Sequence, residues 1–161
     1  MMAEERFWQL IETVWSKVPT LHIIRAIAVK TNDKELLKEL SNAMETQLLP
    51  HFKATLATLD KATLTDFIHF KEAKLYQLDR QEVHKYTSGS DDGFLYCRCF
   101  ILGMGETYYN MIDKNPKQAT VELEGESFGF QAYWLYEEKF GQEFPRNKVH
   151  CIESHSNQEK W

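Results

Sequence analysis

The chain has 161 residues, of which 43% are apolar and 13% are aromatic, enough to form the buried core of one domain. Its 19 basic and 24 acidic residues give a net charge of -5, which argues against nucleic acid and membranes as partners, because nucleic acid and anionic lipid both require clustered cationic charge. The sequence also lacks the roughly 18 to 20 apolar residues of a membrane span and the basic and apolar blocks of a signal peptide, so we expect a cytoplasmic protein.

The first half of the chain shows helical periodicity. Apolar residues between positions 7 and 18 recur at three- and four-residue spacing, which predicts an amphipathic helix. Residues 21–29 are apolar and β-branched, so they suit a strand or a helix. A capping pattern at residues 31–35 predicts a helix that ends near Pro50, and Pro50 can begin another. The pattern Thr63-x-x-Asp66 then predicts the start of a further helix.

The second half begins with a polar stretch, TSGSDDGF, followed by an apolar run, FLYCRCFILG, which we expect to form a buried helix. Gly103-Met104-Gly105 suits a turn into a second helix, ETYYNMI. Residues 116–125 form a loop with a short extended piece at 120–123. A last helix runs from Glu126 to Gly141, which is placed to cap its C-terminus.

These elements predict an all-α fold, a single compact domain of about six or seven helices over residues 1–145. After Pro145 the sequence RNKVHCIESHSNQEKW loses periodicity. We therefore expect residues 146–161 to form a polar C-terminal tail that is loosely packed or frayed.

The start of the buried helix has an explanation that needs no chemistry. Ser90 can cap the helix, because its hydroxyl oxygen can accept a hydrogen bond from a free amide of the first turn. Asp91 and Asp92 would follow in that turn, where the helix dipole favours negative charge by roughly 0.3 to 1 kcal/mol each. Gly93 lets another backbone or a ligand approach closely.

Arg98 is the residue that this explanation does not cover. It lies in a helix that is apolar nearly all round, and an unpaired buried charge costs several kcal/mol, so it requires an acceptor. Asp91 lies two turns earlier on the same face, and Glu106 or a glutamate of the last helix could also serve. Two alternatives stay open: Arg98 and the aspartates form a structural charge network, or Arg98 lines a pocket for an anionic ligand with an aspartate as acid or base.

Other chemistries have little support. His69-x-x-Glu72 shares a helix face, but the second Glu-x-x-His of a di-metal carboxylate bundle is absent. Cys97 and Cys99 would point about 200° apart on a helix, so they suit core thiols rather than a chelate. No Gly-x-Ser-x-Gly motif is present. We assign no metal, no cofactor and no catalytic residue.

Three segments, FWQLIE, SDDGFLYCRCFILGMGETYY and YEEKFGQEFP, occur in an order that resembles a bacterial family, domain-of-unknown-function family 4240. Its members look like small helical proteins with an FW-x-L-I opening, a GCSDDGF-x-x-F-R central motif and an E-x-x-G-x-x-x-P ending. This chain has Gly89 where the family has a cysteine, and Phe100 where a tryptophan is usual. The resemblance implies a helical fold and no particular activity. It also marks the family's motif positions, which are Ser90, Asp91, Asp92, Gly93, Phe94, Arg98, Glu106 and Tyr109.

The sequence leaves two functions open. The first is a non-catalytic protein-interaction or regulatory module with a possible protein partner, suggested by the aromatic residues of the last helix, some of which should be exposed. The alternative is an enzyme or a small-ligand-binding protein. Its candidate binding residues are Ser90, Asp91, Asp92, Gly93, Arg98 and Glu106. The sequence does not determine the oligomeric state.

Overall fold

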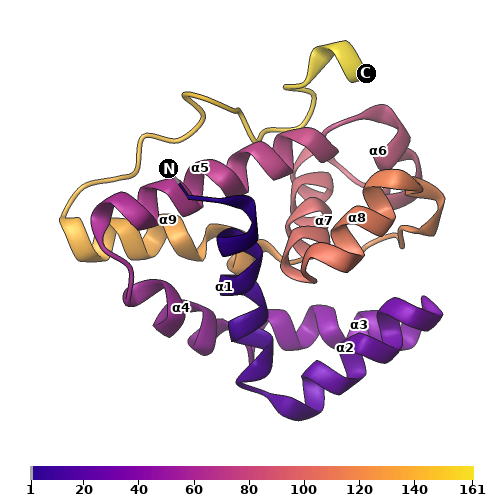
Figure 1. The fold of residues 1–161 in the computed structure, drawn as a ribbon. Helices are drawn as coiled ribbons and strands as arrows, with labels where there is room; N and C mark the ends of the chain where they lie inside the picture. The colour runs from indigo at the N-terminus through magenta and orange to yellow at the C-terminus, as the bar shows by residue number, and fades with distance from the viewer. Residues whose placement is uncertain (1) are drawn as a thin grey trace.

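A computed structural model describes residues 2–161, and within them the chain forms nine α-helices and two short 3₁₀ helices, without a strand (Figure 1). The all-α prediction is confirmed, but the predicted number of six or seven helices is too small. In chain order the elements are α1 (Glu4–Ser16), α2 (Pro19–Thr31), α3 (Lys34–Glu45), α4 (Leu49–Ala57), α5 (Lys61–Leu78), α6 (Gln81–Thr87), α7 (Asp91–Gly103), α8 (Glu106–Lys114), η1 (Pro116–Gln118), α9 (Glu126–Phe140) and η2 (Gln158–Lys160).

The additional helices are α2 and α6. The ambiguous residues 21–29 are helical because Pro19 opens a helix at its first positions, and the packing of α2 on α3 and α1 then decides against a strand. Helix α6 has only seven residues, too few for a periodic pattern to stand out, and Ser88 ends it with a φ of 62°.

Side-chain caps fix several helix starts. The Ser90 hydroxyl accepts a hydrogen bond from the Gly93 amide at 3.1 Å, as predicted for α7. Asp33 caps α3 by accepting from the Leu36 amide. The predicted cap at Thr63 is wrong by one turn, because Asp60 caps α5 and the Thr63 amide donates to its carboxylate at 2.7 Å.

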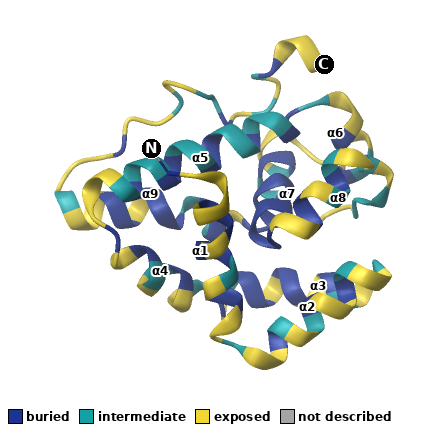
Figure 2. Ribbon diagram, viewed as in Figure 1, coloured by how far each residue is buried: buried dark blue, intermediate teal, exposed yellow. Residues whose placement is uncertain are grey.

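Helix α7 forms the centre of the core and packs against α5, α8 and α9. Nearly all of its residues are buried after the first turn (Figure 2). The contact with α9 is close at Gly129, where an added Cβ would lie 2.3 Å from the Cys99 sulfur. Cys97 and Cys99 are buried free thiols, which confirms their prediction as core residues. None of the helices in residues 2–161 is long and apolar enough to cross a membrane.

The C-terminal tail, residues 146–161, is mostly irregular in conformation and runs along α5 towards α6 (Figure 1). This differs from the expectation of a loosely packed or frayed tail. Ile152 and Asn157 are buried, and the tail is held by hydrogen bonds to residues far away in the sequence. Periodicity cannot predict such packing, because the tail forms neither an α-helix nor a strand.

Candidate functional site

The structure divides the candidate binding residues among separate places. Ser90 caps α7, and an added Cβ at Gly93 would lie 3.3 Å from the Ser90 hydroxyl, so this position suits glycine. Asp91 and Asp92 are exposed in the first turn of α7. The Asp91 carboxylate lies 3.3 Å from the His155 ring, a surface contact that is ionic only when the histidine is protonated.

Arg98 has no exposed surface. Its guanidinium donates to the carbonyl oxygens of Leu75 and Ile152, both at 2.9 Å, and to the Ser154 hydroxyl at 3.2 Å. The group also lies 4.6 Å from the centre of the Phe94 ring. Within residues 2–161 no ion pair joins Arg98 to Asp91 or Asp92, so backbone carbonyls take the place of the expected carboxylates. Because Arg98 is fully buried, it cannot line an open cleft.

Among the acidic residues, Asp79 has the largest influence on the pKa of Arg98. Burial lowers the pKa of Arg98, and the charge of Asp79 opposes that shift. The buried Asp79 carboxylate accepts hydrogen bonds from the amides of His155 and Asn157, both at 3.0 Å, and from the Trp161 indole at 3.1 Å. No motif in the sequence marks Asp79, which directly follows the last residue of α5.

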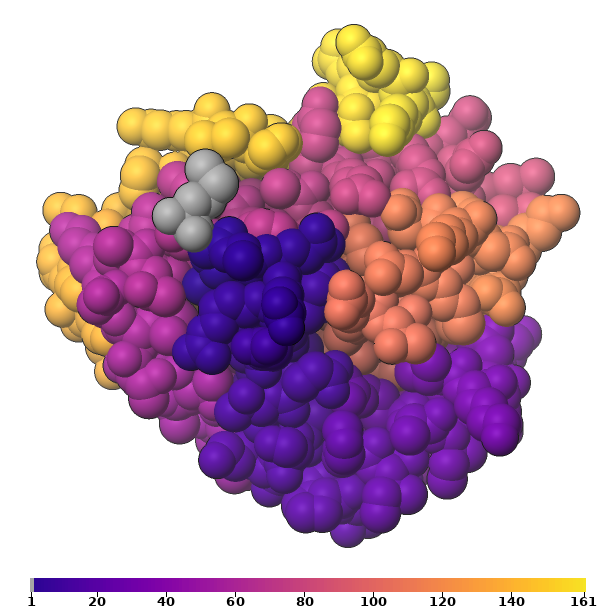
Figure 3. Space-filling view, in the orientation of Figure 1, coloured from indigo at the N-terminus to yellow at the C-terminus, as the bar shows by residue number. Residues whose placement is uncertain are grey.

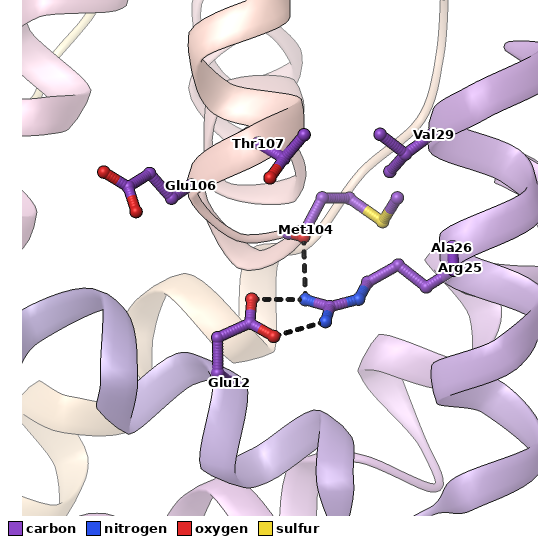
Figure 4. Close-up of a pocket in the computed structure, with 7 residues that line it drawn as sticks. All are labelled: Glu12, Arg25, Ala26, Val29, Met104, Glu106 and Thr107. Carbon is purple, nitrogen blue, oxygen red and sulfur yellow. Dashed lines mark hydrogen bonds and ion pairs between the residues drawn. The ribbon is translucent and has the colours of Figure 1, made fainter.

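Glu106 lies at the opposite end of α7 from the aspartates. A helix of 13 residues is roughly 20 Å long at about 1.5 Å per residue, so these acids cannot act on one small ligand. Glu106 instead lines an open groove of about 450 Å³ between α1, α2 and the start of α8 (Figure 4). In Figure 3 this groove lies where α8 (orange) meets α2 (violet). The residues that line it are Glu12, Arg25, Ala26, Val29, Met104, Glu106 and Thr107.

An ion pair forms the floor of the groove. Arg25 is nearly buried and binds the Glu12 carboxylate through both terminal nitrogens, at 2.9 and 2.5 Å, and the Met104 carbonyl at 3.1 Å. Gly105 makes room for this pair: its φ is +96°, and an added Cβ would lie 2.7 Å from Glu12 Oε1. Figure 4 shows Glu12 and Arg25 pointing at each other, whereas Glu106 points away from them.

An apolar stripe borders the groove on α2. Ile23 is 62% exposed and Ile27 is 48% exposed, although both are large apolar side chains. Ala26, three residues after Ile23, is exposed too and lines the groove, whereas the two isoleucines lie outside its lining. Residues at three- and four-residue spacing share one helix face. The stripe is therefore a continuous apolar surface beside the groove, which we call the α2 stripe.

A second polar cluster is closed within the core. The Lys71 amine donates to the Gly129 carbonyl at 2.6 Å and lies 3.4 Å from the centre of the Tyr133 ring. Burial lowers the pKa of Lys71 to about 7, against the opposing charge of Glu72. The Tyr133 hydroxyl donates to Glu72 Oε1 at 2.8 Å, whereas Glu72 Oε2 has no hydrogen-bond partner. Neither Lys71 nor Glu72 has enough exposed surface to meet a substrate.

The aromatic residues of α9 are mostly core residues, and Trp134 is the exposed exception at 48%. Groups of three or more histidine, cysteine or acidic residues that could hold a metal ion are absent from residues 2–161. The possible metal ligands on α5 have other contacts: Glu72 binds Tyr133, and the His69 ring packs edge-on against Phe144.

Comparison with known proteins gives one result. No curated protein and no solved structure matches the chain. A family model described as "Protein of unknown function (DUF4240)" matches residues 2–139, which include the groove, the α2 stripe and all of α7. This match confirms the resemblance carried by the central SDDGF segment: the chain belongs to the DUF4240 family.

Proposed function

We propose that the protein is a non-catalytic protein-interaction module, and that the α2 stripe and the adjoining groove bind an amphipathic helix of a partner. The observation that carries this proposal is the exposure of Ile23 and Ile27, one turn apart, beside an open groove. Burying an isoleucine side chain contributes roughly 1.5 to 3 kcal/mol. A continuous exposed apolar surface with a polar border is typical of an interaction site.

The charges of the groove specify the chemistry of the partner. The Glu106 carboxylate has no bonding partner within residues 2–161, and the Glu12 side chain remains 45% exposed although it binds Arg25. The whole chain carries a net charge of -5. A helix with apolar residues at three- and four-residue spacing and a lysine or arginine beside them would satisfy both features.

Catalysis has weaker support than binding. The groups with strongly shifted pKa values include Lys71, Cys97 and Cys99, and these residues lie in the core rather than in the groove. The alternative ligand site at SDDGF depends on Arg98 as the cation. Because Arg98 is enclosed by α5, α7 and the tail, this site would have to form by their separation.

A selection experiment tests the proposal. Helical peptides are selected from a display library on the immobilised protein, and their binding is compared on the variants Ile27→Glu and Val149→Glu. Val149 is a matched control, since it is 65% exposed but lies in the tail. We expect the selected peptides to be rich in apolar and basic residues, and to bind Ile27→Glu at least about tenfold more weakly, equivalent to about 1.4 kcal/mol.

The site of binding is then mapped by NMR amide shifts, which should move in α2 and at the start of α8. Peptides that bind Ile27→Glu as well as the wild type, or that shift residues around Trp134 instead, would contradict the proposed site.

A further inference from the structure

The surface that holds the tail, formed by α5, α6 and α7, has the properties of a binding site for a peptide. We infer that this surface is a peptide-binding site, occupied here by the chain's own tail, and that it accepts the same tail from a second copy of this chain. The site is distinct from the groove at α2, so the inference goes beyond the proposed function. Figure 3 shows the tail (yellow) lying along α5.

Two buried charged side chains act as receptors for the backbone of the tail. The Asp79 carboxylate accepts from two tail amides and from the Trp161 indole, and these are its only acceptor bonds within residues 2–161. Arg98 donates to the carbonyl of Ile152. Hydrogen bonds to charged groups contribute roughly 1.5 to 3 kcal/mol each, and bonds to the backbone do not depend on the side chains of the bound segment.

Side-chain contacts on both sides of the residues whose backbone amides bind Asp79 add selectivity. Ile152 is buried on the N-terminal side of them. On the C-terminal side, the Trp161 ring meets the Phe94 ring of α7 edge-on at 5.7 Å and the His84 ring of α6 at 5.4 Å between ring centres. It also packs on His155 of the tail itself. Between Ile152 and Trp161, the Asn157 amide donates to the Tyr76 carbonyl at 3.1 Å. The buried aliphatic Ile152 and the half-buried aromatic Trp161 are therefore anchors of an irregular segment that includes a turn and the 3₁₀ helix η2.

The connection between the tail and the body allows exchange. Both receptor residues, Asp79 and Arg98, lie within the region matched by the family model, whereas the tail lies beyond its end at residue 139. Between the buried residues Phe144 and Ile152 the chain is irregular and largely exposed. When the link opens, the chain loses contacts such as those of Arg146 with the Tyr133 ring and of the buried Ile152. An identical segment from a second copy can make the same contacts again, as in domain swapping.

The tail of a second copy binds weakly as long as the chain's own tail occupies the surface. A short flexible link gives an attached segment an effective concentration on the order of millimolar, so the isolated wild-type chain should keep its own tail in place. The test therefore uses the full-length variant Asn157→Ala/Trp161→Ala, which loses tail side-chain bonds and leaves the receptor surface unchanged.

A fluorescent peptide of residues 147–161 is added, and its anisotropy is measured. We expect the peptide to bind the double variant at least about tenfold more tightly than the wild-type chain, whose own tail competes. A peptide carrying Trp161→Ala should lose this binding. A peptide carrying Glu159→Gln should keep it, because Glu159 is exposed. If the double variant remains folded by circular dichroism and does not bind the peptide, or binds all three peptides equally, the surface is not a peptide-binding site.

The second copy is tested by sedimentation velocity. The double variant, with an intact receptor, is mixed with Asp79→Asn, which has an intact tail and an impaired receptor. We expect a mixed dimer that neither variant forms alone. Peptide binding without a mixed dimer would overturn the second copy as the source of the tail; the peptide experiment itself does not depend on the Asp79 variant.

Discussion

The buried Lys71 amine should make the stability of the protein depend on pH. Burial lowers its pKa from the usual 10.5 to about 7, so between these values the unfolded chain holds a proton that the folded chain has released. Stability rises with pH wherever the unfolded state binds more protons. For Lys71 alone, this difference averages about 0.8 proton between about pH 7 and about pH 8.5, so Lys71 contributes about 1.6 kcal/mol of added stability at the higher pH.

The window ends near pH 8.5 because the cysteines act in the opposite direction. Burial raises the pKa of Cys97 to about 12 and that of Cys99 to about 11. Their thiols therefore keep protons in the folded chain that the unfolded chain loses above about pH 8.5, and stability falls there as pH rises. Below this value the thiols of the unfolded chain are still mostly protonated, so they offset only part of the rise that Lys71 causes.

The measurement is urea unfolding, followed by circular dichroism under reducing conditions at several pH values within the window. Lys71→Met keeps a side chain of similar length and removes the titrating group, so its stability should lack the rise of about 1.6 kcal/mol. Lys38→Met is the control, because Lys38 is exposed on α3, and it should keep the rise. A wild-type chain with flat stability across the window, or a rise that survives in Lys71→Met, would refute a neutral buried amine.

Three further substitutions test the structural roles of Ser90 and Arg98 in α7 and of Gly105 beside the groove. Arg98→Met leaves two buried carbonyls without donors and should lower the free energy of unfolding by about 2 to 5 kcal/mol. The amides of the tail should also lose protection from hydrogen exchange, and unchanged protection would contradict the role of Arg98 in holding the tail. Gly105→Ala should cost about 2 kcal/mol or more in urea unfolding, because the backbone has a φ of +96° and the added Cβ meets the Glu12 carboxylate; an unchanged midpoint would show that the pair moves freely. Ser90→Ala should cost about 1 kcal/mol by removing the cap of α7, whereas Ser90→Asp should keep most of the stability, and equal loss in both would argue against capping.

Much of the fold follows from local sequence patterns. Apolar spacing predicts most of the helices, and the chemistry of Ser90 predicts its cap. The patterns fail where distant contacts decide the outcome. Residues 21–29 become a helix through packing on α3, and the tail becomes ordered through Asp79 and Arg98, which lie more than 50 residues earlier in the chain.

The candidate site is less predictable than the fold, although the sequence holds one signal for it, a lone cation within an apolar run. Arg98 is a lone cation in an apolar run, and Arg25 in LHIIRAIAV is another. The partner of Arg25 is Glu12, which lies 13 residues away on a different helix, so the pair cannot be predicted from the spacing of residues within one helix. Glu106 was a candidate because of the family motif, but only the length of α7 shows that it belongs to a different surface from Asp91 and Asp92.

The role of the SDDGF stretch follows from its contacts rather than from its charges. Ser90 caps the start of α7, and Arg98, further along the same helix, donates hydrogen bonds to the end of α5 and to the tail. The stretch and the helix that it begins therefore hold the centre of the fold together. A signature of this kind identifies a fold without identifying an activity. The exposed isoleucines of the α2 stripe show the opposite: leaving Ile23 and Ile27 in water stabilises nothing in the isolated chain. Burial by a partner, as proposed above, would give their exposure an energetic rationale, so function should be tested first at α2 rather than at SDDGF.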